Sequence, residues 1–499
     1  MEIKMNYTST RGGKDCVSAA GAIKQGLASD GGLFMPEAIP SLTKGDIAKL
    51  CDMSYAERAA YILSLFLTDY TYDELLADCQ CAYAADRFVG GAAPLHKLDA
   101  DTFVLELWHG PTSAFKDMAL QIMPRLLSAA LKKTGEERTA FILVATSGDT
   151  GKAALEGYRD VDGVKIMVFY PVDGVSRVQK LQMATQLGEN VNVCAIKGNF
   201  DDAQTGVKKI FSDKETAELL NENGVFFSSA NSINWGRLAP QIVYYVSAYC
   251  DLINAGEIVS GEVIDVTVPT GNFGNIFAAY IAKMMGLPIN RLVCASNKNN
   301  ILTDFLQTGT YDRNRSFYTT MSPSMDILIS SNLERLLYVM SGSENTAALM
   351  AKLNSDGCYT VDAELKAKLN AHFTGLYCDE VGTAEQIKHT LDENGYLIDT
   401  HTAVALNCAK QYMKKDRSGV KMVVASTASP YKFAADVYES VTGNKPSDEL
   451  QALDELEKLT RTEIPYPLRG IGERKVRFER VIDKDDMKNE VLDTLGIKA

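Results

Sequence analysis

The stretch Phe141-Ile-Leu-Val-Ala-Thr-Ser-Gly-Asp-Thr-Gly-Lys152 indicates the fold class of this chain. Its apolar start predicts a buried strand, its glycine-rich middle predicts a turn, and a helical pattern follows. Further apolar runs alternate with helical patterns along the chain, at residues 165–170, 191–196, 263–268, 292–295 and 422–425. Continuous apolar runs are typical of strands covered on both faces, and strand–helix alternation indicates a mostly parallel sheet. The sequence therefore predicts an α/β protein whose ligands bind at the carboxyl ends of the strands.

Composition narrows the function classes. The chain has 499 residues and a net charge of −13, and this acidic balance argues against nucleic acid, whose phosphates require clustered Lys and Arg. A net negative charge is still compatible with a local binding site for a small anion. No apolar run approaches the roughly 18 residues of a membrane span, and the first residues lack the apolar stretch of a signal peptide. Ten scattered cysteines predict reduced thiols and a cytoplasmic protein.

Turn signals and composition divide the chain into three parts. Helical stretches at residues 41–66 and 72–83 precede Gly90, Gly91 and Pro94, and they predict an N-terminal domain over 1–95. The strand–helix alternation predicts a catalytic core over 96–440. From Asp448 the chain becomes polar and charged, which predicts a C-terminal extension over 441–499 without catalytic residues.

Lys116 is the first candidate for chemistry. It ends the segment Glu106-Leu-Trp-His-Gly-Pro-Thr-Ser-Ala-Phe-Lys116, and Asp117 is the predicted N-cap of a helix over 118–133 with a kink at Pro124. The partial positive charge of a helix N-terminus disfavours an ammonium ion. An amine that is biased toward neutrality can form a Schiff base with a carbonyl group. The alternative is a surface lysine beside a helix cap, which is by far the commoner role of a lysine.

Two glycine-rich turns between a strand and a helix are candidate anion sites. The first carries the hydroxyls of Thr146, Ser147 and Thr150; it is not a nucleotide P-loop, because Thr146 occupies the position of the first glycine. The second is Val268-Pro-Thr-Gly-Asn-Phe-Gly-Asn275. It lacks the Gly-x-Gly-x-x-Gly spacing of a dinucleotide site, so a small anion is the better candidate for both.

Two further segments carry candidate ligand contacts. In Asn231-Ser-Ile-Asn-Trp-Gly-Arg237, the planar fork of Arg237 lies near the neutral donors of Asn231 and Ser232, a set that suits a phosphate. Thr427 follows a predicted strand, where its hydroxyl is either a turn residue or a ligand contact.

Other catalytic constellations are absent from the sequence. The five histidines are dispersed without metal-ligand spacing, and no Gly-x-Ser-x-Gly occurs, so we expect no metal. One lysine beside a helix start together with two anion sites is what a pyridoxal phosphate enzyme needs: the lysine carries the cofactor aldehyde, one site holds its phosphate, and the other holds the substrate.

Several segments, in this order along the chain, resemble the threonine synthase family in its longer, microbial and fungal type. They are Ser29–Pro36, His109–Asp117, Ala145–Gly151, Gly198–Ala203, Asn231–Arg237, Val268–Asn275 and Ser426–Phe433. The resemblance implies fold type II (tryptophan synthase β-like), a two-lobed pyridoxal phosphate enzyme. It implies a carbon–oxygen lyase that converts O-phospho-L-homoserine and water to L-threonine and phosphate.

The resemblance also implies roles for individual residues. Lys116 matches the Schiff-base lysine, Thr427 the hydroxyl that faces the pyridine nitrogen, and Asp149 lies where such enzymes contact the ring 3-oxygen. The loop that holds the cofactor phosphate matches Gly271, Asn272, Phe273, Gly274 and Asn275. The substrate contacts match Thr146, Ser147, Thr150, Asn231, Ser232 and Arg237.

Asp149 departs from many fold type II relatives, which carry Asn at this place. A carboxylate donates no hydrogen bond unless it is protonated. The resemblance further implies that a lobe over about 135–245 closes over the substrate and that the protein is a monomer or a weak homodimer. Two alternatives remain: a phospho-lyase that yields 2-oxobutyrate, phosphate and ammonia from the same site, and a non-enzymatic binding module.

Overall fold

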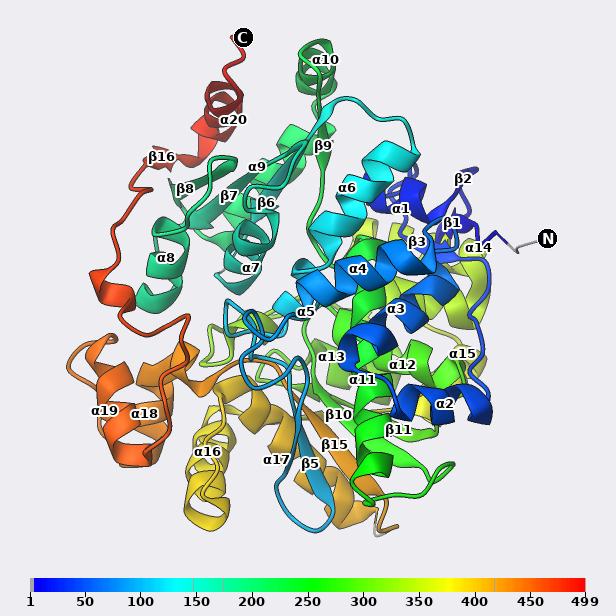
Figure 1. Cartoon of the computed structure of the whole chain (residues 1–499), viewed down its shortest axis with the longest axis vertical. Coiled ribbons are helices and arrows are strands. Elements are labelled where there is room, and N and C mark those ends of the chain that lie inside the picture. The colour runs from blue at the N-terminus through cyan, green and yellow to red at the C-terminus, as the bar shows by residue number, and fades with distance from the viewer. Residues whose placement is uncertain (1–3, 147, 174, 417, 499) are drawn as a thin grey trace.

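Two mostly parallel sheets form the framework of the molecule, as the strand–helix alternation predicts (Figure 1). The computed structural model describes residues 4–146, 148–173, 175–416 and 418–498. Each of the apolar runs that the sequence analysis identified is a strand in one of these two sheets.

The larger sheet has six strands and helices on both faces. Their order across the sheet is β14 (Phe373–Tyr377), β11 (Ile289–Ser296), β10 (Ile264–Pro269), β15 (Lys421–Ser426), β5 (Thr102–Glu106) and β4 (Leu95–Lys97). Only β4 pairs antiparallel. Val423 faces the cluster that includes α11 (Trp235–Asn254) and α12 (Gly274–Met284), whereas Val424 faces α17 (Thr400–Lys415). Alternate side chains thus enter two cores, which explains the uninterrupted apolar run.

The smaller sheet is parallel throughout. Its order is β16 (Val481–Asp483), β8 (Val191–Lys197), β7 (Val164–Pro171), β6 (Thr139–Ala145) and β9 (Val225–Ser228). Ile142 and Val144 share a core with α7 (Asp149–Tyr158), while Phe141 and Leu143 pack with α9 (Phe200–Ser212). The helix α8 (Arg177–Ala184) lies next to α7.

The N-terminal region packs against α11 of the larger lobe. Its helices α2 (Lys44–Cys51), α3 (Tyr55–Phe66) and α4 (Tyr72–Ala82) lie within the stretches predicted as helical. Each begins with a capping box, from Thr43, Ser54 and Thr71 respectively, which satisfies backbone donors that the helix leaves free. A small antiparallel sheet of β1 (Tyr7–Ser9), β2 (Cys16–Val17) and β3 (Phe34–Pro36) completes the region.

The predicted helix over 118–133 is wrong as a single element. The structure has α5 (Asp117–Leu120) and then α6 (Met123–Lys133), with Pro124 in the first turn of α6. Proline is accepted there because its missing N–H has no partner in the first turn of a helix. Asp117 is the first residue of α5, not its cap.

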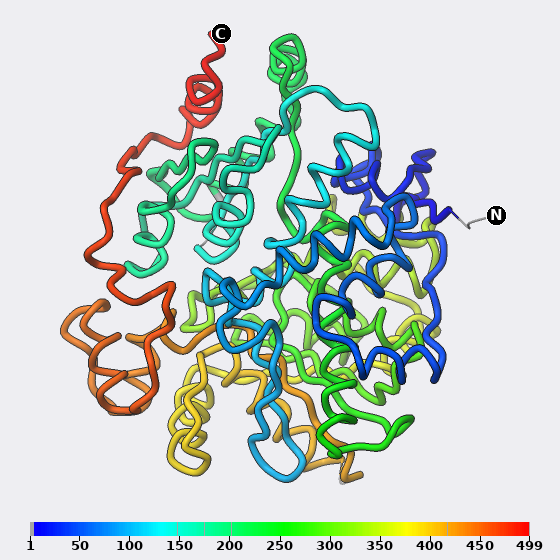
Figure 2. Tube along the Cα trace, viewed as in Figure 1, coloured from blue at the N-terminus to red at the C-terminus, as the bar shows by residue number. Residues whose placement is uncertain are grey.

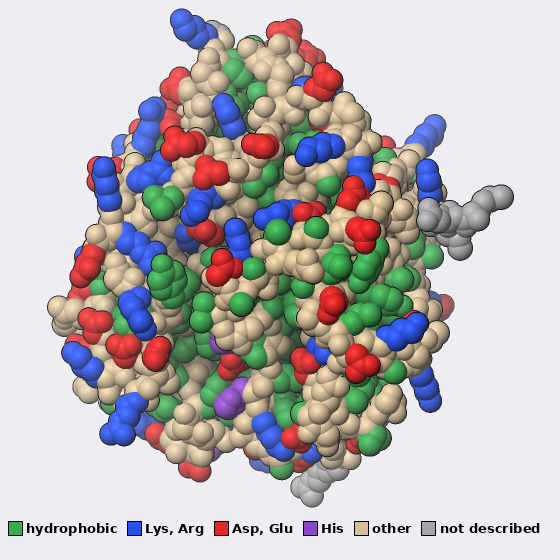
Figure 3. Space-filling view, viewed as in Figure 1, with side chains coloured by type: hydrophobic (Ala, Val, Ile, Leu, Met, Phe, Trp, Pro, Cys, Tyr) green, Lys and Arg blue, Asp and Glu red, His purple; other side chains and the backbone are tan. Residues whose placement is uncertain are grey.

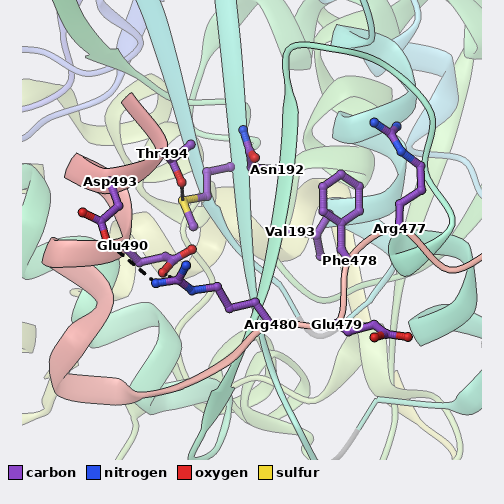
Figure 4. Close-up of a pocket in the computed structure, with 10 residues that line it drawn as sticks. Asn192, Val193, Arg477, Phe478, Glu479, Arg480, Glu490, Asp493 and Thr494 are labelled. Atoms are coloured by element: carbon purple, nitrogen blue, oxygen red, sulfur yellow. Dashed lines mark hydrogen bonds and ion pairs between the residues drawn. The ribbon is translucent and has the colours of Figure 1, made fainter. Parts of the chain in front are cut away.

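The C-terminal segment spans both lobes. Its helices α18 (Ala434–Thr442) and α19 (Gln451–Thr460) share the core of the larger sheet. The chain then runs along one side of the molecule to the smaller lobe, where β16 pairs with β8 and α20 (Met487–Leu495) packs on α9 (Figures 1 and 2). A cavity of about 300 Å³ lies at this junction, where Arg480 reaches Glu490 at 2.6 Å (Figure 4).

The other elements border this framework. They are α1 (Ala19–Gln25), α10 (Lys214–Glu222), α13 (Ile301–Thr308), β12 (Thr310–Asp312), α14 (Leu333–Asp356), β13 (Cys358–Thr360), α15 (Ala363–His372) and α16 (Glu380–Asn394). Within the described part of the chain, no helix combines the length and the apolar character that crossing a membrane requires. Lys and Arg side chains are interspersed with Asp and Glu on the face shown in Figure 3.

Replacing Met487 by Ala should lower the free energy of unfolding by about 2–4 kcal/mol, because it removes a buried side chain from a tight contact. Met487 is 1% exposed, and a Cβ on Gly206 of α9 would lie 2.3 Å from its sulfur. Urea denaturation followed by circular dichroism measures the effect. Met284, which is 37% exposed, is the matched control, and its change to Ala should cost about 0.5 kcal/mol or less. Equal effects of the two changes would show that α20 contributes no packing.

Candidate active site

Lys116 lies at the carboxyl edge of the larger sheet. The segment that carries it follows β5 and pairs with the segment after β15: Phe115 N–H donates to the carbonyl of Thr427 at 2.8 Å. Ser429 N–H likewise donates to the carbonyl of Ser113 at 3.1 Å. The structure therefore brings Lys116 and Thr427, more than 300 positions apart, to one place at the edge where a parallel sheet binds its ligands.

The Lys116 side chain is buried among polar groups. Its Nζ lies 3.4 Å from Asp149 Oδ2 and 3.3 Å from Ser324 Oγ. Burial lowers the pKa of the Lys116 amine, and the Asp149 carboxylate only partly offsets this. The nearby cations of Arg237 and Lys432 lower that pKa further. A buried amine with a lowered pKa is poised to attack a carbonyl carbon.

Asp149 is the first residue of α7 and contacts two lysines. Its Oδ1 accepts from Lys432 Nζ at 2.8 Å and from Gln179 Nε2 at 2.9 Å, while Oδ2 faces Lys116. Burial alone would raise the pKa of Asp149, but the ammonium groups of Lys432 and Lys116 outweigh burial and hold it well below its ordinary value. Asp149 is therefore an anion that accepts hydrogen bonds.

The loop from Gly271 to Asn275 forms the start of α12, and its backbone is open to an anion. Phe273 has a left-handed φ of 60°, and no side chain caps the helix. A Cβ on Gly271 would lie 2.6 Å from the carbonyl oxygen of Ser324, so only glycine fits. The first N–H groups of an uncapped helix attract phosphate through their donors and the helix dipole.

Asn275 adds an oriented donor to this loop. Its Oδ1 accepts from the hydroxyls of Tyr244 at 2.6 Å and Tyr245 at 2.5 Å, which fixes the amide orientation. Its Nδ2 is buried, and no acceptor lies within reach among the residues that the structure describes. A buried donor without a partner costs free energy, and a phosphate oxygen would satisfy it.

Asn332, at the start of α14, joins this loop to the Asn231–Arg237 segment. Its Nδ2 donates both to the carbonyl of Asn272 at 3.0 Å and to Ser232 Oγ at 3.1 Å. Arg335, fully buried, donates to the carbonyls of Ser232 and Ile233. The two predicted binding segments are thus held against each other by one helix.

Arg237 is a buried cation whose charge is not matched. It is 5% exposed, and its Nη1 donates to the carbonyl of Ala230 at 2.6 Å. No carboxylate lies within ion-pair distance of it in the described part of the chain. Burial lowers the pKa of Arg237 to about 10. An uncompensated buried cation is costly, which makes this position suited to an anionic ligand.

The remaining predicted substrate contacts lie in the loop before α7, in the first turn of α7 and in the loop before α11. The Thr146 hydroxyl accepts from the N–H groups of Gly148 at 3.0 Å and Gly151 at 2.9 Å, so its oxygen closes the loop. Thr150 lies half-buried in the first turn of α7. Asn231 is half-buried in the loop before α11, whereas Arg237 lies in the first turn of that helix. Ser147 lies outside the described residues.

Sequence reasoning missed several groups of this site. Lys432, Gln179, Ser324 and Asn332 all contact predicted residues, yet they come from distant segments. His401, hydrogen-bonded through Nδ1 to Asp399 at 2.9 Å, accepts the N–H of Ser324 on Nε2 at 3.1 Å. Only Lys432 had a signal, since it lies in the segment Ser426–Phe433 that carries part of the family resemblance.

These features fit one class of cofactor. The amine of Lys116 is buried and biased toward neutrality, so it suits an aldehyde. The uncapped start of α12, with the free amide donor of Asn275, suits the phosphate of such a cofactor. The buried cation of Arg237 is then left for an anionic substrate. No group of three or more His, Cys, Asp or Glu residues is placed to hold a metal ion within the described ranges. The fold and the site define a pyridoxal-phosphate-dependent enzyme of fold type II.

Comparison with known proteins gives the family. Family profiles match residues 6–83 as threonine synthase N terminus, 88–427 as pyridoxal-phosphate dependent enzyme, and 402–490 as threonine synthase, C-terminal. The chain belongs to the threonine synthase family.

Relatives of this chain include threonine synthases and threonine synthase-like 1 proteins. Threonine synthase of Pseudomonas aeruginosa is 38% identical over 93% of this chain and 96% of its own length. Human threonine synthase-like 1 is 41% identical over 84% of this chain, and the match spans 57% of that protein. The crystal structure of threonine synthase from Brucella melitensis with bound pyridoxal phosphate superposes with a TM-score of 0.87, at 37% identity, over 98% of this chain and 99% of that one.

Changing Asn275 to Asp should weaken pyridoxal phosphate binding by about 100-fold or more, since it replaces the free donor by a negative charge beside the cofactor phosphate. Equilibrium titration of the cofactor, followed by its visible absorbance, measures the change. Asn370→Asp, on an exposed turn of α15, alters the net charge equally and should leave the affinity unchanged. Equal affinities for both variants would remove Asn275 from the cofactor site.

Proposed function

We propose that this chain is a threonine synthase, a carbon–oxygen lyase that converts O-phospho-L-homoserine and water to L-threonine and phosphate. The observation that carries the proposal is the buried guanidinium of Arg237, which no carboxylate pairs with among the described residues. Cofactor binding accounts for Lys116 and for the start of α12, but it leaves Arg237 without an anion. A substrate with its own phosphate supplies that partner.

We assign the substrate phosphate to Arg237, Asn231 and Ser232, with Thr146, Ser147 and Thr150 as further substrate contacts. The guanidinium offers a planar fork that matches phosphate oxygens, and hydroxyl and amide donors complete the shell. Asn332 supports this assignment, because it holds Ser232 and the cofactor loop together through two hydrogen bonds. The cofactor phosphate and the substrate phosphate would then bind at separate places whose relative position is fixed.

Lys116 is the proton carrier of the proposed reaction. When bound, pyridoxal phosphate stabilises the negative charge that develops as protons leave the substrate carbons. The Lys116 amine takes the proton from the substrate Cα and carries protons to and from the neighbouring substrate carbons. The Asp149 carboxylate raises the pKa of this amine and so keeps it basic enough for that role. Ser324, 3.3 Å from the amine, orients it.

Thr427 and the loop residues would hold the cofactor in place. We assign the cofactor phosphate to Gly271, Asn272, Phe273, Gly274 and Asn275. Thr427, 6% exposed beside the Lys116 segment, would offer the ring nitrogen a neutral hydroxyl. A hydroxyl cannot protonate that nitrogen as a carboxylic acid would, which favours chemistry at the β and γ carbons over more extensive charge delocalisation.

The two lobes bring together different parts of this site. Asp149 and Gln179 belong to the smaller lobe, whereas Lys116, Lys432 and the cofactor loop belong to the larger one. We propose that residues from about 135 to 245 form a mobile lobe within a core over 96–440, flanked by a domain over 1–95 and an extension over 441–499. The last residues of this range, from Trp235, lie in α11, which packs with the larger sheet. Closure of this lobe would exclude water until it is needed. We further propose a monomer or weak homodimer.

Incubation of the cofactor-loaded protein with O-phospho-L-homoserine tests the reaction directly. We expect threonine and phosphate in equal amounts, identified by amino-acid analysis and phosphate release. Release of 2-oxobutyrate, phosphate and ammonia would instead assign the related lyase activity. No phosphate release would contradict both activities.

Arg237→Met should lower kcat/KM for O-phospho-L-homoserine by about 100- to 1000-fold, because a buried charge-assisted contact is lost. Cofactor affinity should stay within about threefold of the wild type. Arg237→Lys, which keeps the charge but not the planar fork, should fall between the two proteins. Equal losses of cofactor affinity and turnover would reassign Arg237 to the cofactor.

A further inference from the structure

The active site contains a second buried lysine that the reaction described above does not use. We propose that Lys432 is a positioning residue: its ion pair with Asp149 keeps that carboxylate an anion and aims its other oxygen at Lys116. The proposal rests on the proposed function only in taking Lys116 as the lysine that binds the cofactor. It does not depend on which substrate the protein converts.

The Lys432 side chain is enclosed by protein and does not reach solvent. It lies in the 3-10 turn Pro430–Phe433, its side chain is fully buried, and its Nζ lies 2.8 Å from Asp149 Oδ1. The same Nζ donates to the carbonyl of Thr112 at 2.9 Å. One ammonium group thus links the turn after β15, the segment that leads to Lys116, and the first residue of α7 in the other lobe.

The two oxygens of Asp149 have different partners. Oδ1 accepts from Lys432 and Gln179 at 2.8 and 2.9 Å, which leaves it no further room. Oδ2 faces Lys116 and Ser324, both at 3.4 Å. Because two short contacts hold Oδ1, the carboxylate cannot rotate, and Oδ2 is the oxygen that stays directed at the amine.

The charges that face Asp149 decide its protonation state. The cations are Lys432 from the turn after β15 and Lys116 from the start of α5. Arg237 of α11 acts on Lys116, and His401 of α17 reaches the cluster through Ser324, whose N–H it accepts. Lys432 also acts on Asp117, a carboxyl that accepts from Thr112 and whose pKa is raised to about 6, chiefly by burial.

Lys116 alone cannot keep Asp149 ionised throughout the reaction. Its own amine changes protonation and bonding as it reacts with the cofactor aldehyde, so its charge is not constant. Lys432 has no such role, and its ammonium group stays beside Oδ1. Without Lys432, burial would favour the protonated form of Asp149, as it does for Asp117. A protonated Asp149 would present a neutral group to Lys116 and would no longer stabilise positive charge on its nitrogen.

The test is the pH dependence of the visible spectrum of the cofactor-loaded protein, recorded between pH 5 and 9 without substrate. Lys432→Met should add a spectral transition on the acid side, as Asp149 takes up a proton. The double variant Lys432→Met/Asp149→Asn should lack that transition. Lys432→Arg, which keeps the charge, should retain the wild-type profile. Cofactor affinity should fall about tenfold or more in Lys432→Met and by less than threefold in Lys432→Arg.

Each control separates one alternative. Asp149→Asn leaves Asp117 in place, so a transition that survives in the double variant belongs to another group and overturns the proposal. An unchanged spectral profile in Lys432→Met also overturns it. If Lys432→Met does not fold, Lys432→Gln carries the same test, because it keeps a donor for the carbonyl of Thr112 but removes the charge. Since no substrate is present, failure to form threonine leaves these readouts intact.

Discussion

An excess of buried positive charge at the junction of the two lobes dominates this structure. Lys116, Lys432 and Arg237 are each at least nine-tenths buried, and Asp149 is the one carboxylate that pairs with any of them among the described residues. Burying a cation costs several kcal/mol unless an anion compensates it. The fold therefore maintains a site that lacks negative charge, and we propose that a phosphorylated cofactor and a phosphorylated substrate supply it. The net charge of −13 gives no hint of this local excess.

The two sheets make this arrangement possible. Each places the start of a helix at its carboxyl edge, α12 from the larger sheet and α7 from the smaller. The first of these offers uncapped backbone donors, to which we assign the cofactor phosphate, whereas the second contributes Asp149 itself. The C-terminal segment connects the same two lobes on the outside, from α19 to β16 and α20, so the two parts of the site are also joined away from the chemistry.

Much of this could be predicted from the sequence, and the rest could not for physical reasons. The strands from Phe141, Val191 and Met422 were evident from apolar runs, and glycine-rich turns after strands indicated both candidate anion loops. Short strands such as β9 and β16 hold at most three consecutive apolar residues; they are strands because a neighbouring strand pairs with them. β16 completes a sheet almost 300 residues away from its neighbour β8 in sequence.

The same limit applies to the site. Lys116 was identified by its own local context, beside a helix start. Gln179 and Ser324 contact Asp149 and Lys116 from different segments, so no local pattern marks them. Lys432 had only the family resemblance of the segment Ser426–Phe433 as a signal. Asp149 itself was identified, but not its state: a carboxylate in place of the usual amide becomes explicable only when the ammonium group at 2.8 Å is seen.

Calorimetric titration of the cofactor-loaded protein with inorganic phosphate tests the central claim most directly. With the cofactor phosphate already in place, we expect one saturable phosphate site per chain, which Arg237→Met abolishes while the cofactor absorbance is unchanged. No saturable binding, or equal binding by the wild type and Arg237→Met, would contradict the claim that the lobe junction is built for a second phosphate.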